Sequence, residues 1–389
     1  MREDFLLLNP GPVPVDRDVR EAMSEPLVSH RSAAFEDAYA RAQAGLDYVF
    51  ERSTPSGART AEDGTSLILN GTATMGMEAA VANLVEDDSE VVSLVNGKFG
   101  RRFARIADRH ARGDRVEATW GESIDLDEVR AAVTDDTDVV TMVHNETSTG
   151  LLNPVAEVGE IAAEHDAHFV VDGVTSIGGD EFRIDDWDVD VAVTDAQKAL
   201  AVPPGISALY VTPDAADAFD GEGAPFYEDL DWHLRKAADD QTPFTSAVSL
   251  VRALAVAVEH IEDETMPARI ERHRRQARAF GEAFVAMGLE RFPDVAGPTE
   301  LSNTVTAIAL PESLRGDPDD FFDAVEARGV SISGGQAHLG GEIFRVSNMG
   351  NLSREQVLRG VRTVGEAMLE AGVDVDAEAG MAAARAALD

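Results

Sequence analysis

The sequence predicts an α/β protein, with a large domain built on a mostly parallel sheet wrapped by helices and a smaller C-terminal α+β domain. Two observations lead to this prediction. First, six short runs of apolar and β-branched residues alternate with helical patterns between residues 65 and 212. Alternating strands and helices favour a parallel sheet covered by helices. Second, the pattern becomes long and helical after residue 246, and only two more apolar runs follow it.

The expected elements begin with an extended arm, because residues 1–15 are rich in proline. Runs that are apolar on both faces predict buried strands at residues 65–71, 90–97, 138–146, 168–174, 190–197 and 207–212. Helical patterns lie between most of them, at residues 74–85, 100–111, 126–133 and 155–165. Ligands of such sheets bind beyond the carboxyl ends of the strands. Polar residues that follow a strand are therefore the first candidates for a functional site.

A helical stretch is expected at residues 246–288, where it would bridge two domains. The sequence beyond it predicts a small α+β unit, with strands at 303–310 and 342–348 and helices at 319–329 and 353–372. At 389 residues the chain exceeds the roughly 100–200 residues of an ordinary domain. The predicted division is an N-terminal arm at 1–15, a large domain at 16–266 and a small C-terminal domain at 267–389.

The composition describes a strongly acidic chain. The net charge is −39, from 72 acidic and 33 basic residues, and the acidic residues are spread along the sequence. Such a charge repels nucleic acid and anionic membrane surfaces, so neither is expected as a partner. Screening at very high salt would make this self-repulsion tolerable, and we therefore expect a halophilic protein.

Several chemistries are excluded by what the sequence lacks. It has no cysteine, which rules out disulfides, thiolate metal sites and a thiol nucleophile. Its nine histidines lack the spacing of metal ligands, so no metal site is expected. The apolar run near the N-terminus is too short for a signal peptide, and no run approaches the roughly 18 residues that span a bilayer. The expected location is cytoplasmic.

Lysine is nearly absent from this chain, which makes Lys198 conspicuous. The lysines are Lys98, Lys198 and Lys236, and the other thirty of the 33 basic residues are arginines. Lys198 follows an apolar run and precedes the sequence Pro-Pro-Gly. Arginine stays protonated and cannot form an imine, whereas a lysine with a lowered pKa is a nucleophile for carbonyl groups. Lys198 is therefore a candidate to form a Schiff base, either with a substrate or with pyridoxal phosphate.

Two further segments carry groups that pyridoxal phosphate requires. Asp172 ends the apolar run at 168–174, where a carboxylate could keep the ring nitrogen protonated. Thr72, Ala73 and Thr74 lie between a strand and a helix, where backbone N–H groups bind phosphate. Taken singly, an aspartate at a strand end is commonly a turn residue, and Gly-Thr before a helix is commonly a cap.

An aromatic side chain and an arginine complete the set. Phe99 follows the run at 90–97 and could lie against the face of the cofactor ring, although such a residue is more often part of a core. Arg345 lies inside the apolar run at 342–348, and its guanidinium suits the carboxylate of an amino-acid substrate. Most arginines of this chain are expected in surface ion pairs, but the apolar neighbours of Arg345 set it apart.

These segments resemble the class V aminotransferases of the alanine–glyoxylate and serine–pyruvate type, which are fold-type I pyridoxal phosphate enzymes. The similarity covers nearly the whole chain, from LNPGPVPV at the N-terminus to beyond Arg345. Its strongest parts are NGTATMGMEAA, HNETSTG, VDGVTSIGG and QKALAVPPG, which stand in the order and spacing of the family. The resemblance implies a fold-type I transferase fold, pyridoxal 5'-phosphate as cofactor and a homodimer with shared active sites.

The resemblance also implies roles for single residues. Lys198 matches the lysine that bonds the cofactor and then acts as general base and acid, and Asp172 matches the partner of the ring nitrogen. Arg345 matches the arginine that holds the substrate carboxylate, and Gly11 matches the backbone that closes over the substrate. The matched cofactor contacts are Phe99 at the ring face, Thr147 near the phenolic oxygen, Thr72, Ala73, Thr74 and Gln197 at the phosphate, and Thr242 and Thr245 from the neighbouring subunit.

Three positions depart from the family pattern. Ala73 stands where glycine is common, Thr242 where a tyrosine occurs in some relatives, and Ala196 where a hydroxyl residue is often found. These changes remove phosphate contacts, and each missing hydrogen bond is worth about 0.5–1.5 kcal/mol. The lysine, the aspartate and the arginine are untouched, so the reaction type is expected to be unchanged.

The expected function is a ping-pong transaminase that moves the amino group of a small amino acid, alanine or serine, to glyoxylate or pyruvate through a Schiff base at Lys198. The alternatives are a related transaminase for aspartate or 2-aminoethylphosphonate, and a non-catalytic relative that binds pyridoxal phosphate. Cysteine desulfurases share the fold but need a cysteine to accept sulfur, which this chain lacks.

Overall fold

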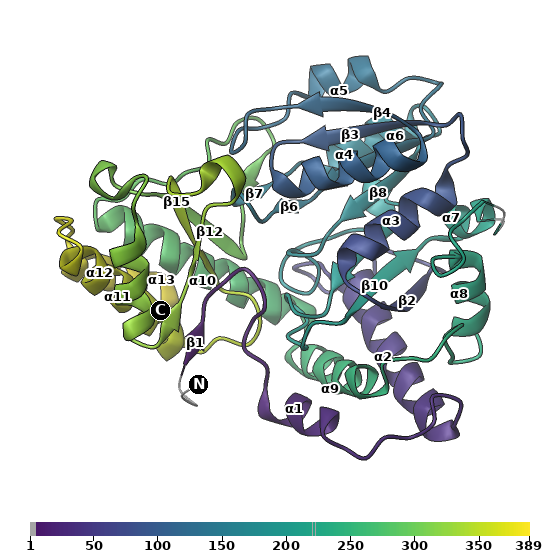
Figure 1. Ribbon diagram of the computed structural model, residues 1–389, viewed down its shortest axis with the longest axis horizontal. Helices are drawn as coiled ribbons and strands as arrows, with labels where there is room; N and C mark the ends of the chain where they lie inside the picture. The colour runs from purple at the N-terminus through teal and green to yellow at the C-terminus, as the bar shows by residue number, and fades with distance from the viewer. Residues whose placement is uncertain (1–4, 220, 222) are drawn as a thin grey trace.

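The computed structural model of the chain describes residues 5–219, 221 and 223–389. The first four residues of the expected N-terminal arm lie outside the described residues. A seven-stranded sheet with its helices forms the larger part of the molecule, and a smaller unit made mainly by the C-terminal third of the chain lies beside it (Figure 1).

The seven strands of the central sheet are ordered β2–β10–β9–β8–β5–β3–β4. All of them except β10 run in the same direction. The apolar runs of the sequence form β2 (Thr65–Asn70), β3 (Glu90–Val95), β5 (Val139–Val143), β8 (His168–Asp172), β9 (Val191–Asp195) and β10 (Ile206–Val211). The predicted mostly parallel sheet is therefore confirmed, with one antiparallel strand.

One strand of this sheet was not predicted. β4 (Arg112–Glu117) has the sequence RGDRVE, and only its valine is buried. It pairs with β3 at the edge of the sheet. An edge strand can carry charged side chains on both faces, so it gives no apolar run in the sequence.

Helices pack against the sheet between successive strands. α3 (Ala73–Leu84) contacts β8, β9 and β10, and α4 (Lys98–His110) contacts β3, β4 and β5. α2 (Ala33–Arg52) packs against β2 and β10, and α6 (Val155–Ala163) against β5 and β8. Shorter helices complete this part, namely α1 (Arg17–Met23), α5 (Leu126–Ala132), η1 (Asp185–Trp187), α7 (Pro213–Ala218) and α8 (Leu230–Ala237).

The helical stretch expected at 246–288 is divided into two helices. α9 (Val248–Glu264) packs against α2, and α10 (Met266–Ala286) begins two residues after α9 ends. Thr265 between them has a φ of 71°, and Pro267 near the start of α10 cannot donate a helical hydrogen bond. Side chains early in α10 belong to the core of the larger part, whereas those from Ala279 onward belong to the core of the smaller unit.

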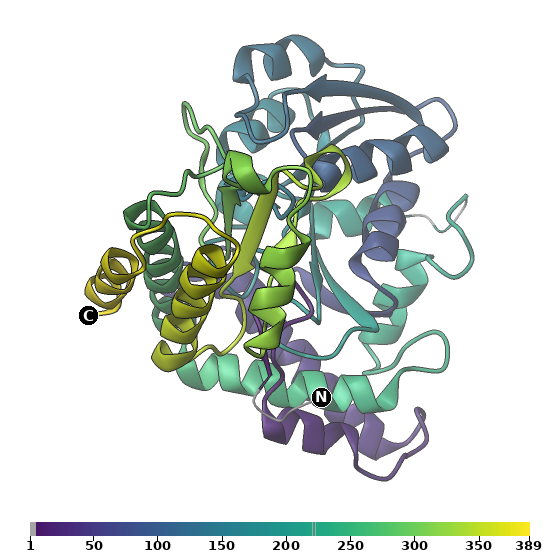
Figure 2. The same ribbon diagram turned by 60° about the vertical axis from the view of Figure 1, so that its left-hand side comes forward.

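The smaller unit contains an antiparallel sheet of β12 (Val305–Ala309), β15 (Ile343–Ser347) and β14 (Ser333–Gly334). The helices α11 (Asp319–Ala327), α12 (Arg354–Glu370) and α13 (Ala377–Leu388) flank it (Figure 2). α13 was not predicted. The N-terminal arm joins this unit, because β1 (Leu6–Leu7) pairs with β13 (Val330–Ser331). The remaining short elements are β6 (Asn145–Glu146), β7 (Leu151–Leu152), β11 (Glu300–Leu301), η2 (Glu312–Leu314) and η3 (Ala337–Leu339).

Two large hydrophobic cores accompany these two sheets, one around the seven strands and one among α10, α11, α12 and β15. The domain boundaries at residues 16, 266 and 267 stay a prediction. Among the described helices, none combines the length and the hydropathy that a membrane crossing requires.

Candidate active site

A cavity of about 380 Å³ opens where the N-terminal arm, the central sheet and the smaller unit meet. Its wall includes residues that follow the carboxyl ends of β2, β8 and β9, as expected for a sheet of this kind. Ten residues predicted from the sequence line it, namely Gly11, Thr72, Ala73, Thr74, Phe99, Thr147, Asp172, Gln197, Lys198 and Arg345. Thr242 and Thr245 do not line it.

Lys198 lies three residues beyond the end of β9, and the N-terminal arm covers it. Its Nζ donates a hydrogen bond to the carbonyl oxygen of Pro10. Gly11 has a φ of 93°, and a Cβ at this position would lie 2.7 Å from Cδ of Lys198. A side chain at residue 11 would therefore displace the arm or the lysine, and the positive φ already favours glycine at this position.

The surroundings of Lys198 lower the pKa of its ammonium group to about 8. Burial is the largest cause, since a charged amine is poorly solvated in the cavity. The carboxylates of Asp195 and Asp172 oppose this effect, and the guanidinium groups of Arg345 and Arg102 add to it. The cavity therefore makes this lysine a better nucleophile near neutral pH.

Asp172 ends β8, next to β9 in the sheet. Its carboxylate accepts one hydrogen bond, 2.9 Å from the backbone nitrogen of Val174, and the residue is 4% exposed. Burial raises its pKa to about 7, with a smaller contribution from the nearby carboxyl of Glu146. A cationic partner in the cavity would stabilise the ionised form of this buried carboxyl group.

Arg345 lies in the middle of β15 and is 3% exposed. Its Nε and Nη2 donate to the carbonyl oxygen of Gly334 at 3.1 and 2.8 Å, and its Nη1 donates to the carbonyl oxygen of Thr147 at 2.8 Å. The hydrogen bonds of this guanidinium within the described chain all go to backbone carbonyls, and burial lowers its pKa to about 10. Such a guanidinium is ready to bind a carboxylate from outside the chain.

The start of α3 forms one end of the cavity. Thr72 is the N-cap residue of this helix, and the hydroxyl of Thr74 accepts a hydrogen bond from Nη1 of Arg102 at 2.6 Å. The N–H of Ala73 is already bound, because it donates to Oδ2 of Asp195 at 3.1 Å. This end of the cavity therefore offers a helix N-terminus with a cation on one side and a carboxylate on the other.

Gln197 lies beside this helix start. Its side chain is hydrogen-bonded to Asp195, and its Oε1 is buried without a hydrogen-bond partner in the described chain. Burial raises the pKa of Asp195, while the bonds from Gln197 and Ala73 oppose that effect. The amide of Gln197 is thus left with unused capacity at the cavity wall.

Phe99 is positioned by the buried carboxylate of Glu146. Oε2 of Glu146 accepts hydrogen bonds from the backbone nitrogens of Phe99 and Gly100, each at 3.0 Å, at the start of α4. The guanidinium carbon of Arg102 lies 4.8 Å from the centre of the Phe99 ring. Glu146 precedes Thr147, whose hydroxyl lies 3.0 Å from that of Thr175. One segment therefore fixes both the aromatic ring and the cavity hydroxyl.

Sequence reasoning missed four polar residues of the cavity wall, namely Arg102, Asp195, Ser333 and Gln336. Arg102 lies three residues after Phe99, and both belong to the start of α4, so their side chains share a face. The predicted helix began at residue 100, one residue after Phe99, and so did not pair them. Asp195 ends a strand in the same way as Asp172, and this signal could have found it. Gln336 lies in a loop of the smaller unit, and no pattern in the sequence marks it.

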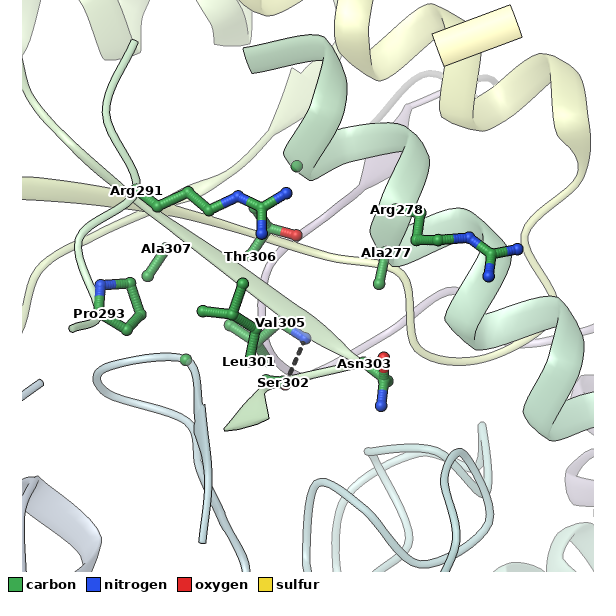
Figure 3. A pocket seen from close by; sticks show the side chains of 12 residues that line it. Ala277, Arg278, Arg291, Pro293, Leu301, Ser302, Asn303, Val305, Thr306 and Ala307 are labelled. Carbon is green, nitrogen blue, oxygen red and sulfur yellow. Dashed lines mark hydrogen bonds between the residues drawn. The ribbon is translucent and has the colours of Figure 1, made fainter. Parts of the chain in front are cut away.

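A second cavity of about 150 Å³ lies between α10 and β12 (Figure 3). Arg278 of α10 and Arg291 lie on opposite sides of it, with Val305 and Thr306 of β12 between them. The residues that line this second cavity include no predicted site residue, no lysine and no carboxylate. The cavity around Lys198 is therefore the candidate active site.

The comparison with known families decides the identity of this fold and site. The sequence profile of the family described as aminotransferase class-V matches residues 6–357 of the chain. The chain belongs to this family. The resemblance found from the sequence is thereby confirmed, and the protein is a pyridoxal phosphate-dependent aminotransferase.

Relatives of known activity cover almost the whole class-V chain. An L-aspartate–glyoxylate aminotransferase of Paracoccus denitrificans is 30% identical over 386 residues, which is 97% of this chain and 94% of the relative. A serine–glyoxylate aminotransferase of Arabidopsis thaliana is 28% identical over 387 residues, again 97% and 94%. The solved structure of an alanine–glyoxylate aminotransferase from Nostoc superposes with a TM-score of 0.85, at 29% identity, over 95% of this chain and 96% of that one. The expected fold-type I architecture is confirmed.

The cavity of this class-V aminotransferase fits pyridoxal phosphate. A buried carboxylate at Asp172 with a single chain hydrogen bond suits the protonated ring nitrogen, and the lysine with the lowered pKa suits the aldehyde. The start of α3 and the guanidinium of Arg102 suit the phosphate, whereas Oε1 of Gln197 is an acceptor and offers it no hydrogen bond. When bound, the cofactor supplies an electron sink for the carbanion at the substrate α-carbon. Lys198 would then move the proton through its Nζ, and Phe99 would face the ring.

Proposed function

We propose that this enzyme transfers the amino group of a small amino acid, alanine or serine, to glyoxylate or pyruvate in a ping-pong reaction. The observation that carries the proposal is Arg345, a buried guanidinium bonded to backbone carbonyls in the same cavity as Lys198. An α-carboxylate, which both the amino acid and the 2-oxo acid possess, would satisfy this cation. Arg345 then serves both half-reactions.

The size of the cavity supports a small substrate. A volume of about 380 Å³ has to hold both the cofactor and the amino acid. The N-terminal arm closes the cavity over Lys198 through Pro10 and Gly11. A covered cavity of limited volume favours small substrates such as alanine, serine, glyoxylate and pyruvate.

We assign the predicted roles to the residues of the cavity. Lys198 bonds the cofactor and moves the proton at the α-carbon, and Asp172 keeps the ring nitrogen protonated. Gly11 of the arm closes over the substrate. The cofactor contacts that we propose are Phe99, Thr147, Gln197 and the start of α3 at Thr72, Ala73 and Thr74.

A homodimer is part of the proposal. Phe226 is 75% exposed and Tyr227 43% exposed, and both rings contact Phe244 within the loop that leads to α9. Exposed aromatic side chains of this kind favour burial against a protein surface. Thr245 in the same loop is exposed, and its carbonyl accepts a hydrogen bond from Asn70 near the start of α3. We propose that Thr245 reaches the phosphate of the partner subunit through this surface. The predicted role of Thr242 is not supported in the same way, because Thr242 is 2% exposed and its hydroxyl donates to the carbonyl oxygen of Phe244 at 2.8 Å.

The aspartate and 2-aminoethylphosphonate alternatives are favoured by the guanidinium of Arg102 in the cavity, and the aspartate alternative also by the L-aspartate–glyoxylate aminotransferase among the relatives. A second cation could hold a second anionic group of the substrate. Arg102 is bonded to Thr74, however, and this bond places it at the start of α3 rather than beside Arg345. We therefore assign Arg102 to the cofactor phosphate. The cytoplasmic location and the halophilic habit stay predictions.

A half-reaction experiment tests the proposal. The purified enzyme, loaded with pyridoxal phosphate in strong salt, is mixed with alanine, serine, aspartate or 2-aminoethylphosphonate, and the conversion of the aldehyde form is followed by absorbance. Conversion with alanine or serine and recovery on adding glyoxylate or pyruvate is the expected result. Conversion with aspartate alone would favour the first alternative. Borohydride reduction followed by peptide mapping should find the reduced cofactor attached to Lys198. A protein that binds the cofactor but shows neither this attachment nor conversion with any amino acid would be the non-catalytic relative.

A further inference from the structure

Gln336 lies in the loop between β14 and β15 and lines the cavity together with Ser333 and Arg345. Its Oε1 is buried, and no hydrogen-bond partner for it exists among the described residues. A buried amide oxygen without a partner is unfavourable, because it has lost its water without gaining a hydrogen bond. The position of Gln336 therefore calls for a partner that enters the cavity from outside.

The backbone around Gln336 is held firmly. A Cβ at Gly335 would collide with the carbonyl oxygen of Leu339, so the loop can turn only with glycine at this position. The N–H of Leu339 donates to the carbonyl oxygen of Gln336 at 3.1 Å, and the N–H of Gly335 donates to Ile343 at 3.0 Å. These bonds fix the Cα of Gln336 relative to β15, which carries Arg345.

The same loop is fixed against the larger part of the molecule. The ring of His338 lies 4.5 Å from the ring of Trp120. The guanidinium of Arg101 also lies 4.5 Å from the Trp120 ring. The loop that carries Gln336 is thus packed against the larger part of the molecule at His338, two residues after Gln336.

Most polar side chains of the cavity wall already have partners. The hydroxyl of Thr147 lies 3.0 Å from that of Thr175, and the hydroxyl of Ser333 accepts from Asn9 at 2.9 Å. Gln197 also has a buried Oε1 without a partner among the described residues, but its side chain is hydrogen-bonded to Asp195 near the start of α3. Gln336 lies instead in the loop that leads to β15, the strand that carries Arg345, so it is the unpaired amide best placed to serve a substrate bound at Arg345.

We propose that Gln336 selects amino donors whose side chain carries a hydroxyl group, so that serine is preferred to alanine. This inference rests on the proposed function, since it takes Arg345 as the site of the α-carboxylate. Gly334, which accepts two hydrogen bonds from Arg345, lies two residues before Gln336. A hydroxyl on the β-carbon can donate to Oε1, whereas the methyl group of alanine leaves the amide unpaired.

Single-turnover half-reactions with serine and alanine test this inference. The wild-type holoenzyme should favour serine about tenfold or more in the ratio of rate constant to apparent dissociation constant, as expected when one buried acceptor is left unpaired. Gln336→Met keeps the length of the side chain and removes the amide. We expect it to lose about tenfold with serine and less than twofold with alanine.

Gln43→Met is the matched control, because Gln43 makes its hydrogen bond to Ser66 in the larger part of the molecule and does not line the cavity. It should keep the serine preference. Equal reaction of the wild-type enzyme with both amino acids, or a parallel loss with both in Gln336→Met, would overturn the inference while leaving the transaminase intact. A wild-type enzyme that converts neither amino acid would overturn the proposed function as well. The wild-type comparison stands even if the variant fails to fold.

Discussion

Opposing electrostatic effects act on the amino group of Lys198. Burial and the guanidinium groups of Arg345 and Arg102 favour the neutral amine, and the carboxylates of Asp195 and Asp172 favour the ammonium form. The balance leaves the pKa at about 8. At pH 7.5 roughly a quarter of the molecules would then carry a neutral amine, against roughly 0.1% for an ordinary lysine with a pKa near 10.4. The difference decides whether the lysine reacts with an aldehyde near neutral pH.

We predict that capture of pyridoxal phosphate by the cofactor-free enzyme follows the titration of Lys198. Because only the neutral amine attacks, the second-order rate constant should rise about tenfold per pH unit below pH 8 and level off above it. Stopped-flow absorbance across pH 6 to 10 in constant salt measures this profile. Lys198→Arg should form no reducible bond, since arginine stays protonated. A rate that keeps rising to pH 10 would mean that the cavity does not perturb the lysine.

At the scale of single residues, the sequence was most informative where a residue was out of place. A lysine in a chain of arginines and an arginine within an apolar strand both led to the cavity wall. Gln336 gave no such signal, because a glutamine in a loop is ordinary until the fold buries its Oε1. Its position depends on packing between the two parts of the molecule, and no local pattern encodes that packing.

At the scale of elements, the start of α3 shows a competition for one N–H group. The backbone of Ala73 donates to the carboxylate of Asp195, although a phosphate at this helix start would use the same donor. The guanidinium of Arg102 is hydrogen-bonded to the hydroxyl of Thr74 at the same helix start, and its positive charge compensates in part for the carboxylate of Asp195. The phosphate therefore has to share the helix start with a carboxylate, and this lowers the affinity of the unloaded chain for the cofactor.

We predict that Asp195→Asn binds pyridoxal phosphate about tenfold more tightly than the wild type. The asparagine oxygen can still accept from Ala73, while the negative charge near the phosphate is removed, and a charge at this range is worth about 1–2 kcal/mol. Equilibrium titration followed by cofactor fluorescence measures the dissociation constant.

Pyridoxal without its phosphate is the control ligand for Asp195→Asn. Loss of the Asp195 charge also lowers the pKa of Lys198, and this effect acts on both ligands alike. The phosphate repulsion is therefore measured by how much more the affinity for pyridoxal phosphate rises than the affinity for pyridoxal. If Asp195→Asn bound both ligands more weakly, and by the same factor, Asp195 would instead be needed to shape the loop that carries Lys198.

The elements themselves differed in how well the sequence encoded them. Strands buried on both faces were predicted because burial favours apolar side chains at most positions. The edge strand β4 escaped prediction, since solvent accepts its charged residues. The break at Thr265 also escaped, because apolar residues continue at helical spacing through α9 and α10 on either side of it. The fold class thus follows from burial, whereas edges and breaks follow from tertiary contacts.

The whole molecule is dominated by its negative charge. With 72 acidic and 33 basic residues, ion pairs can neutralise fewer than half of the carboxylates. Many of the observed pairs are exposed on the surface, including Arg17 with Glu21 and Arg41 with Glu259, and such pairs contribute only about 0–1 kcal/mol. The remaining carboxylates repel one another, and folding brings them closer together. Stability must therefore depend on how strongly the solvent screens these charges.

We predict that the free energy of unfolding rises steeply with salt. Screening lengths fall from about 30 Å at 0.01 M to about 3 Å at 1 M, so the repulsion among exposed carboxylates should largely vanish over that range. Urea unfolding followed by circular dichroism in increasing potassium chloride measures the rise, and sucrose at equal osmolality is the control for effects other than screening.

Glu282→Lys, at an exposed position of α10 in the described chain, should raise stability at low salt and have little effect at 1 M or above. An unfolding free energy that is flat in salt would show that the acidic surface does not oppose folding, and the prediction of a halophilic protein would lose its physical basis.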